Sequence, residues 1–316
     1  DAPHRGPLDW TTEVVVIGSG AGGAVVASEL AEAGIPTVLV EQGAHHTRRD
    51  FNQREPDMMA LLYEDAGART TVDGHIVVLH GRAVGGSTVV NWAICFDPPS
   101  DVLERWASEH GLSDLLDADL PRALKKVRHV LNVQPIPEGM VPLAGQKLLA
   151  GARALGLEAG MLEHNRTGCL QSGFCMLGCA YDRKQTMLVT YVPRALHHGA
   201  RLLPGARVDR ILARGDVATR AGENLTLHPT SAVIARFDEP IHAVRGIHYT
   251  THVSEWASEG ILIESVFAYP GLLAASSLRM GRELERLMTA YNHLAGAIVL
   301  VHDEGRGRVG ALPDGT

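Results

Sequence analysis

A glycine-rich turn that directly follows an apolar strand is the sequence feature that most constrains the fold of this chain. The run Glu13–Gly18 is rich in β-branched residues, as is typical of a strand that is covered on both faces in a parallel sheet. An alanine-rich stretch then extends to Gly34, and its small residues predict a helix that packs closely on the sheet. A second apolar run, Pro36–Glu41, predicts the next strand. Together they predict the strand–turn–helix–strand unit of an α/β fold.

Three glycines in this turn, Gly18, Gly20 and Gly23, match the dinucleotide-binding pattern G-x-G-x-x-G. The first glycine permits the tight bend, the second has no Cβ to block a pyrophosphate, and the third allows close packing of the helix. Glu41 ends the second strand, where it can accept hydrogen bonds from a ribose diol. The pattern alone does not separate NAD from FAD, and a glycine-rich turn without a ligand is the alternative. The residues of this segment predicted to bind a cofactor are Gly18, Ser19, Gly20, Gly22, Gly23 and Glu41.

The length of the chain and its later part predict a second structural unit. A chain of 316 residues exceeds the usual limit of a single core, and 45% hydrophobic residues are enough to fill two. After a loop-rich stretch that ends at about His80, helices are predicted near Asp101–His110, Asp119–Leu131, Ala144–Leu155 and Gln185–His197. From Asn224 onward the chain has three β-rich runs, Ser231–Phe237, Ile261–Phe267 and Ala295–Val301. One helix is predicted among them, near Arg282–Tyr291. This part is expected to form a mainly antiparallel sheet.

Charge and hydropathy argue against two classes of protein. A net charge of -7 disfavours nucleic-acid binding, which needs a dense excess of Lys and Arg, so small, neutral partners fit better. The apolar stretch Gly260–Leu278 is interrupted by Glu264 and Pro270, so none of its uninterrupted runs reaches the roughly 18 to 20 residues of a membrane span. The polar N-terminal segment has no basic start followed by an apolar stretch, so we expect a soluble, cytoplasmic protein.

A second glycine cluster, Gly81–Asn91, distinguishes between the two cofactors. Together with the N-terminal fingerprint it resembles the glucose–methanol–choline (GMC) oxidoreductase family, in which such a stretch runs beside the pyrophosphate and the flavin ring of FAD. The resemblance disfavours an NAD-dependent dehydrogenase and implies FAD as the cofactor. It also implies that the adenine lies at the backbone of Val208. The residues that it places at the flavin portion of FAD are Gly85, Gly86, Ser87 and Asn91.

The resemblance extends over nearly the whole chain. It continues through the segments Asn165–Gly168, Gly173–Cys179, Lys184-Gln185, Gly222–Leu225 and His228-Pro229. It implies a Rossmann-like FAD-binding domain over residues 1–222, with inserted loops and helices. Residues 223–316 would form an incomplete substrate-binding domain built on the antiparallel sheet.

The function implied by the resemblance is that of an FAD-dependent oxidoreductase. Such an enzyme oxidises the CH–OH group of an alcohol by hydride transfer to the flavin, and its electron acceptor is oxygen, a quinone or a cytochrome. The mainly apolar runs Ile261–Phe267 and Tyr269–Leu273 indicate a hydrophobic alcohol.

The sequence departs from the family pattern in two places. In the family, a longer segment returns the chain to the FAD domain at this point, and Ala213–Ala221 is too short for it. The resemblance implies that about fifty residues are absent here. The catalytic histidine of the family and its partner are expected beyond Thr316, so no catalytic residue is assigned. The alternative function is therefore a catalytically incomplete flavoprotein, a fragment or remnant that binds FAD without turnover.

Three cysteines, Cys169, Cys175 and Cys179, lie in a glycine-rich loop and allow three interpretations. They could ligate an iron–sulfur cluster, or zinc together with His164, but their spacing matches neither kind of site well. We favour thiols packed in the loop, and no metal is predicted. His228 follows a segment that lies near the flavin in the family, but a structural role is favoured for a histidine without a named partner.

Overall fold

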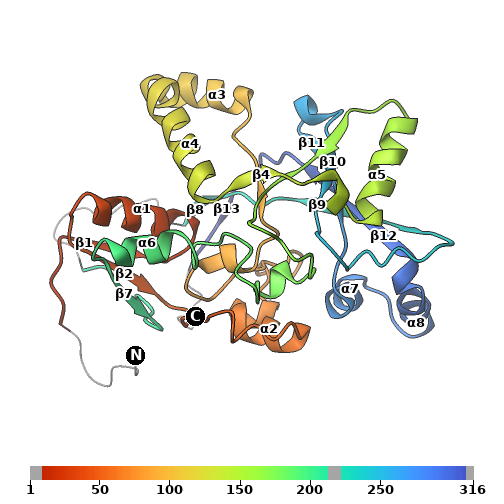
Figure 1. Ribbon diagram of the computed structural model, residues 1–316, viewed down its shortest axis with the longest axis horizontal. Helices are drawn as coiled ribbons and strands as arrows, with labels where there is room; N and C mark the ends of the chain where they lie inside the picture. Colours follow the sequence, from red (N-terminus) through yellow and green to blue (C-terminus); the bar gives the residue numbers. More distant parts are fainter. Residues whose placement is uncertain (1–8, 213–221, 311–316) are drawn as a thin grey trace. The chain divides into compact units, whose positions relative to one another are not determined.

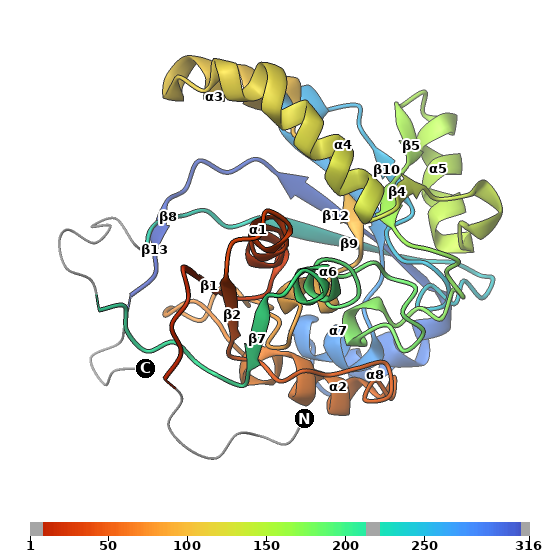
Figure 2. The same cartoon turned by 60° about the vertical axis from the view of Figure 1, so that its left-hand side comes forward.

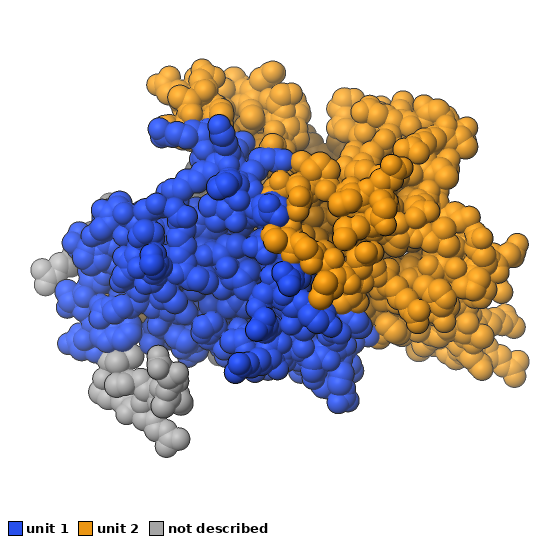
Figure 3. Space-filling view, in the orientation of Figure 1, with its two compact units in different colours: residues 1–93, 122–132, 174–209 blue, residues 94–121, 133–173, 210–316 orange. Residues whose placement is uncertain are grey.

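The computed structural model describes residues 9–212 and 222–310. The chain forms two compact units (Figure 3). Unit 1 contains the described residues up to Ala93 together with Arg122–Asn132 and Phe174–Asp209, and unit 2 contains Ile94–Pro121, Val133–Gly173 and the residues from Arg210 onward. In the described residues, no helix is long and apolar enough to cross a membrane.

Unit 1 is built on a three-stranded parallel sheet (Figure 1). Its strands, in the spatial order β1-β2-β7, are β1 (Val14–Ile17), β2 (Thr37–Glu41) and β7 (Arg201–Pro204). Val14 is opposite Thr37, and Val38 is opposite Arg201. The helices α1 (Ala21–Glu32) and α6 (Tyr191–His197) pack against each other and against these strands (Figure 2). The predicted Rossmann-like unit is confirmed.

The prediction that the first strand is covered on both faces is wrong for the described residues. Val16 is buried against the start of α1, but Val15 is 55% exposed and Ile17 is 51% exposed. Successive side chains of a strand point to opposite faces, so α1 covers one face of β1 only.

Two helices of unit 1 differ from their predicted positions. The stretch expected to be loop contains α2 (Glu55–Leu62), which buries Met58 and Leu62. The helix predicted from Gln185 begins only at Tyr191. Thr190, directly before α6, has the non-helical backbone angles φ −120° and ψ −86°, so the helix cannot extend through it toward Gln185. The helix α4 (Leu120–Val130) is close to its prediction, and its Lys126 donates to Glu29 of α1 at 2.6 Å.

Unit 2 is built on a five-stranded antiparallel sheet, as predicted. The strands, in spatial order, are β5 (Ala159–Met161), β10 (Thr251–Val253), β11 (Ile261–Val266), β12 (Leu294–Val301) and β9 (Thr230–Arg236). The helix α5 (Leu143–Ala154) covers one face of this sheet, where the Thr251 hydroxyl donates to Ser265 Oγ at 2.9 Å and lies 3.3 Å from Gly145 O.

The remaining elements of unit 2 are short. The helices α7 (Pro270–Ser276) and α8 (Arg282–Thr289) form a small core with the ends of the large sheet, centred on Phe267, Leu287 and Leu294. A second antiparallel sheet consists, in spatial order, of β3 (Ile94–Cys95), β6 (Glu163–Asn165) and β4 (Val133–Pro135). The helix α3 (Ser100–His110) and the strand pair β8 (Glu223–Leu225) and β13 (Gly307–Arg308) complete the unit.

The two units interleave along the chain, whereas the sequence predicted one boundary between residues 222 and 223. Residues 94–121 and 133–173 pack with unit 2 because β5 pairs with β10 and α5 packs on β10 and β11. Which part binds cofactor and which binds substrate stays a prediction. The short segment Ala213–Ala221 lies outside the described residues.

Candidate functional site

The glycine fingerprint forms the turn between β1 and α1. Gly18 has φ +89°, a conformation that favours glycine, and its N–H donates to Val40 O at 2.8 Å. A Cβ on Gly23 would lie 1.9 Å from Gly18 O, so a side chain here would collide with the turn. The glycines therefore allow α1 to begin directly beneath the end of β1, with the free N–H groups of its first turn close to the end of the sheet.

The second glycine cluster packs against the fingerprint, backbone on backbone. Gly86, in the short 3₁₀ helix η2 (Gly86–Val89), has φ +55°. A Cβ on Gly86 would lie 2.8 Å from Gly20 Cα, and one on Gly81 would lie 2.8 Å from Ser87 Cα. The two motifs that carry the cofactor prediction are thus brought into one place.

A buried serine joins these motifs to the acidic residue at the end of β2. The Ser19 hydroxyl donates to Glu41 Oε2 at 2.7 Å and accepts a hydrogen bond of 2.9 Å from Gly85 N. Glu41 Oε1 accepts a further hydrogen bond of 2.7 Å from Gly43 N. A carboxylate accepts about four hydrogen bonds, so Glu41 retains acceptor capacity for a ribose hydroxyl while being held in place by the turn.

A cavity of about 410 Å³ lies at this junction in unit 1. Six of the predicted cofactor-binding residues line it, namely Gly18, Gly20, Glu41, Gly86, Ser87 and Val208. Five do not. Ser19, Gly23 and Gly85 shape the turns instead, Gly22 lies in the first turn of α1, and the exposed Asn91 accepts from Ala93 N at 3.2 Å. The sequence did not single out Gln42, His80, Thr88, Ala206 and Arg207, which also line the cavity. In the sequence, only their position next to the motifs indicated that these residues could line a cofactor site.

The residues around this cavity fit FAD in its adenosine and pyrophosphate parts. The cavity combines a helix N-terminus, which favours negative charge, with glycine backbone that a Cβ would fill and a carboxylate suited to a ribose. The contact of each predicted residue with FAD stays a prediction.

A buried lysine fixes the segment that follows the second glycine cluster. Lys184 is 3% exposed, and its ammonium donates to the carbonyl oxygens of Val89 at 2.7 Å, Asn91 at 2.8 Å and Cys175 at 2.8 Å. The Lys184-Gln185 pair was noticed in the sequence only as part of the family resemblance, because a lysine's acceptors cannot be read from its neighbours in the chain.

The cysteine loop shows no arrangement for a metal in the part of the chain that the structure describes. Cys169 belongs to unit 2, whereas Cys175 and Cys179 belong to unit 1. In the described residues, no group of three or more His, Cys, Asp or Glu side chains could hold a metal ion. His164, considered as a zinc ligand, is buried with Nε2 2.7 Å from Tyr249 O, and burial lowers the pKa of its ring to about 3.

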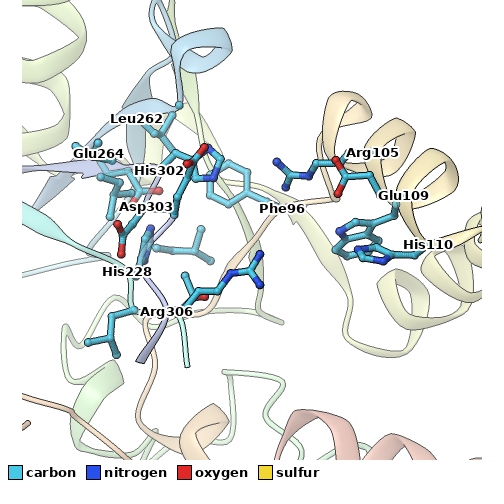
Figure 4. A pocket seen from close by; sticks show the side chains of 18 residues that line it. Phe96, Arg105, Glu109, His110, His228, Leu262, Glu264, His302, Asp303 and Arg306 are labelled. Carbon is cyan, nitrogen blue, oxygen red and sulfur yellow. The ribbon is translucent and has the colours of Figure 1, made fainter. Parts of the chain in front are cut away.

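A second cavity, of about 1130 Å³, lies within unit 2 (Figure 4). Leu262 and Glu264 of β11 line it together with Leu300 of β12, which is paired with Leu262. Because Ser265 faces α5, its neighbour Glu264 points to the opposite face of the sheet, which is the face that the cavity covers. Polar residues from three other segments complete the wall, namely Arg105, Glu109 and His110 of α3, His228, and His302, Asp303 and Arg306 after β12.

Glu264 is the most unusual group of this cavity. It is 3% exposed, and its Oε1 atom has no hydrogen-bond partner among the described residues. Burial raises the pKa of its carboxyl to about 7 because the charged form loses its hydration. The sequence offered Glu264 only as a charge that interrupts an apolar run.

Comparison with known families gives two matches. Residues 59–284 match the family model described as GMC oxidoreductase, and residues 11–62 match the model described as FAD binding domain.

Individual proteins are similar to this chain as well. A GMC-type oxidoreductase of Mycobacterium tuberculosis (strain ATCC 25618 / H37Rv), itself described as uncharacterized, is 34% identical over 96% of this chain and 55% of its own length. A long-chain-alcohol oxidase of Arabidopsis thaliana is 30% identical over 67% of this chain and 28% of its own length. The chain thus spans 55% of the length of the mycobacterial relative, about half.

Solved structures share the fold. The crystal structure of pyridoxine 4-oxidase from Mesorbium loti superimposes with a TM-score of 0.66 at 14% identity, over 95% of this chain and 73% of that one. A formate oxidase of Aspergillus oryzae RIB40 gives a TM-score of 0.61 at 11% identity, over 92% of this chain and 72% of that one.

Proposed function

Because the chain belongs to the GMC oxidoreductase family and has FAD as its cofactor, we propose that it oxidises the CH–OH group of an alcohol by hydride transfer to the flavin. The single observation that carries the proposal is the junction at Ser19, where both glycine motifs and Glu41 meet around one cavity. Bound FAD supplies the redox chemistry by accepting the hydride.

The residues of unit 1 bind and orient the cofactor in this proposal. The N–H groups at the start of α1 hold the pyrophosphate, and the Glu41 carboxylate accepts hydrogen bonds from the ribose. Gly86 and Ser87 lie at the flavin portion, and the backbone of Val208 lies at the adenine. Lys184 keeps the segment Val89–Asn91 in position through its three carbonyl acceptors.

Unit 2 binds the alcohol, in the cavity bounded by Leu262, Leu300 and Phe96. The similarity to a long-chain-alcohol oxidase supports an apolar alcohol as substrate and oxygen as the electron acceptor, with a quinone or a cytochrome as the alternative acceptors. A cytoplasmic location is also part of the proposal. All four cysteines lie in the described residues and none is in a disulfide, which suits a reducing compartment.

The test is a spectroscopic titration of the purified chain. The protein is saturated with FAD, separated from free cofactor and mixed anaerobically with a series of primary and secondary alcohols. Retained flavin absorption that bleaches with an alcohol supports the proposal. Retained flavin that no alcohol bleaches supports the alternative, a flavoprotein that binds FAD without turnover. Failure to retain FAD contradicts the cofactor site itself.

A further inference from the structure

The cavity of unit 2 contains a polar group for which the described residues supply no complete set of partners. Glu264 is 3% exposed and its Oε1 atom is unpartnered among the described residues. A buried polar group that lacks a hydrogen bond destabilises a fold, so such a group usually finds a partner in water, an ion or a ligand. Glu264 also lies on the sheet face that lines the cavity, and Figure 4 shows it among the side chains of the cavity wall. Its position therefore points to a ligand.

The surroundings of Glu264 are those of an amphipathic ligand site. The two leucines that pair across β11 and β12, Leu262 and Leu300, share its sheet face, and the ring of Phe96 also lines the cavity. These side chains offer apolar contact to a hydrocarbon body, whereas the carboxyl offers one polar contact. Arginines enter the wall from other segments, as Arg105 of α3 and Arg306 beyond β12.

We propose that Glu264 is the polar anchor of a binding site for a neutral, apolar alcohol, with the hydroxyl of the alcohol hydrogen-bonded to the Glu264 carboxyl and its carbon chain against Leu262, Leu300 and Phe96. The choice of an alcohol rests on the proposed function. The site itself rests on the geometry of Glu264 in its cavity. Glu264 acts here in recognition, and no step of the oxidation is assigned to it.

The charge around the anchor distinguishes this ligand from related ones. A carboxylate of the same chain length would lose the hydration of its own charge in a cavity whose wall also contains Asp303, so it is expected to bind much more weakly. A plain alkane cannot hydrogen-bond to the carboxyl. An alkylammonium ion would need the ionised carboxylate, whereas burial raises the pKa of Glu264 to about 7 and so favours a neutral partner near neutral pH.

The proposal is tested by calorimetric titration of the FAD-loaded chain under anaerobic conditions with hexan-1-ol, hexanoate, hexylammonium and hexane. We expect hexan-1-ol to bind at least ten-fold more tightly than each of the other three. Equal affinity for hexanoate, or tighter binding of hexylammonium, would overturn the assignment. Trp106 also lines the cavity, so hexan-1-ol should change its fluorescence, and this change should be absent in Trp106→Phe.

Variants of Glu264 separate recognition from a structural role. Glu264→Leu should bind hexan-1-ol at least ten-fold more weakly than the native chain, and Glu264→Gln, which keeps a hydrogen-bonding group, should stay within about three-fold. Glu259→Leu, at an exposed carboxyl outside the cavity, is the matched control and should bind like the native chain. Glu264→Leu should also unfold at an equal or higher denaturant concentration, because it removes a buried carboxyl whose Oε1 has no hydrogen-bond partner among the described residues. A lower unfolding midpoint with unchanged binding would show that Glu264 is structural.

The two proposals fail in different ways. Binding of hexan-1-ol that depends on Glu264, without any bleaching of the flavin, would contradict the proposed function and retain the site. Bleaching by alcohols that is indifferent to Glu264→Leu would contradict the site and retain the function. If Glu264→Leu does not fold, the site is still tested by the affinities of the native chain for the four ligands and by the affinity of Glu264→Gln for hexan-1-ol.

Discussion

The Ser19 hydroxyl donates a hydrogen bond of 2.7 Å to the Glu41 carboxylate, and both side chains are buried. The same hydroxyl accepts the N–H of Gly85 at 2.9 Å, so one atom connects the fingerprint, the end of β2 and the second glycine cluster. The cofactor cavity depends on this connection, because it joins three of the four segments, far apart in the sequence, that form the cavity walls.

Replacing Ser19 by alanine should weaken FAD binding while the fold remains. Ser19→Ala leaves the Gly85 N–H without its acceptor and removes one donor from the Glu41 carboxylate. A hydrogen bond to a charged group contributes about 1.5–3 kcal/mol, so FAD affinity should fall by roughly ten-fold or more. Equilibrium titration with FAD measures it. Ser108→Ala, at an exposed serine of α3, is the control, and equal affinities of the two variants would contradict the role of Ser19.

Two neighbouring glycines of α1 should respond in opposite ways to the same substitution. A Cβ on Gly23 would lie 1.9 Å from Gly18 O, whereas a Cβ on Gly22 would meet nothing within 4 Å. We expect Gly23→Ala to lose FAD binding and much of its thermal stability. Gly22→Ala should keep both, with a gain in stability of up to about 1 kcal/mol from the higher helix propensity of alanine. Thermal unfolding with and without FAD checks both variants, and similar losses in the two would refute the packing argument.

Removing the ammonium of Lys184 should destabilise unit 1. Lys184→Met leaves the carbonyl oxygens of Val89, Asn91 and Cys175 without a donor in a buried place. Each unsatisfied carbonyl costs about 1–3 kcal/mol, so a total loss of at least roughly 3 kcal/mol is expected, together with weaker retention of FAD. Chemical denaturation measures it, against Lys125→Met at an exposed position of α4. A loss no larger than that of the control would contradict the account of Lys184.

Glu264 should make the stability of the protein depend on pH. Burial raises the pKa of its carboxyl from about 4.5 in the unfolded chain to about 7 in the fold. The folded protein therefore binds the proton of Glu264 more tightly than the unfolded chain does. The stabilisation that this proton binding adds to the free energy of unfolding is fully present below pH 4.5 and is lost as the pH rises to about 7. One pKa unit corresponds to about 1.4 kcal/mol, so the loss amounts to roughly 3 kcal/mol.

The neutral variant Glu264→Gln isolates this effect. Its free energy of unfolding should equal that of the native chain near pH 4.5 and should exceed it by up to roughly 3 kcal/mol above pH 7, in denaturant titrations across this range. A difference that is constant with pH would show that burial does not shift the titration of Glu264.

The sequence predicted those parts of the fold that local patterns determine. The run up to Gly18 and the small residues after it specify β1, the turn and α1, because a glycine fingerprint works only between a strand and a helix. The β-rich runs from Asn224 onward predicted the large antiparallel sheet. The helix α2 was missed because Glu55–Leu62 has only a weak apolar stripe. The start of α6 was predicted too early because the non-helical backbone angles of Thr190 cannot be read from its residue type.

The candidate site was predictable to the extent that its chemistry lies in motifs. Gly18, Gly20, Gly86 and Ser87 could be found by pattern, and they line one cavity. Lys184 and Glu264 could not, because their significance depends on burial and on acceptors supplied by distant segments. The interleaving of the two units was not predicted for the same reason. Strand β5 pairs with β10, about ninety residues further along the chain, and no local pattern indicates that pairing. Closing so long a loop costs little more entropy than closing a short one, so sequence separation does not exclude such pairs.

The most direct test of the central claim is anaerobic reduction of the bound flavin by hexan-1-ol, compared with hexan-1-ol deuterated at the hydroxyl-bearing carbon. Transfer of hydride from that carbon predicts that the flavin bleaches and that the deuterated alcohol bleaches it more slowly, because the C–H bond breaks in the step that reduces the flavin. Flavin that stays oxidised with hexan-1-ol and with every other alcohol tested would contradict the claim that this chain is an alcohol-oxidising flavoenzyme.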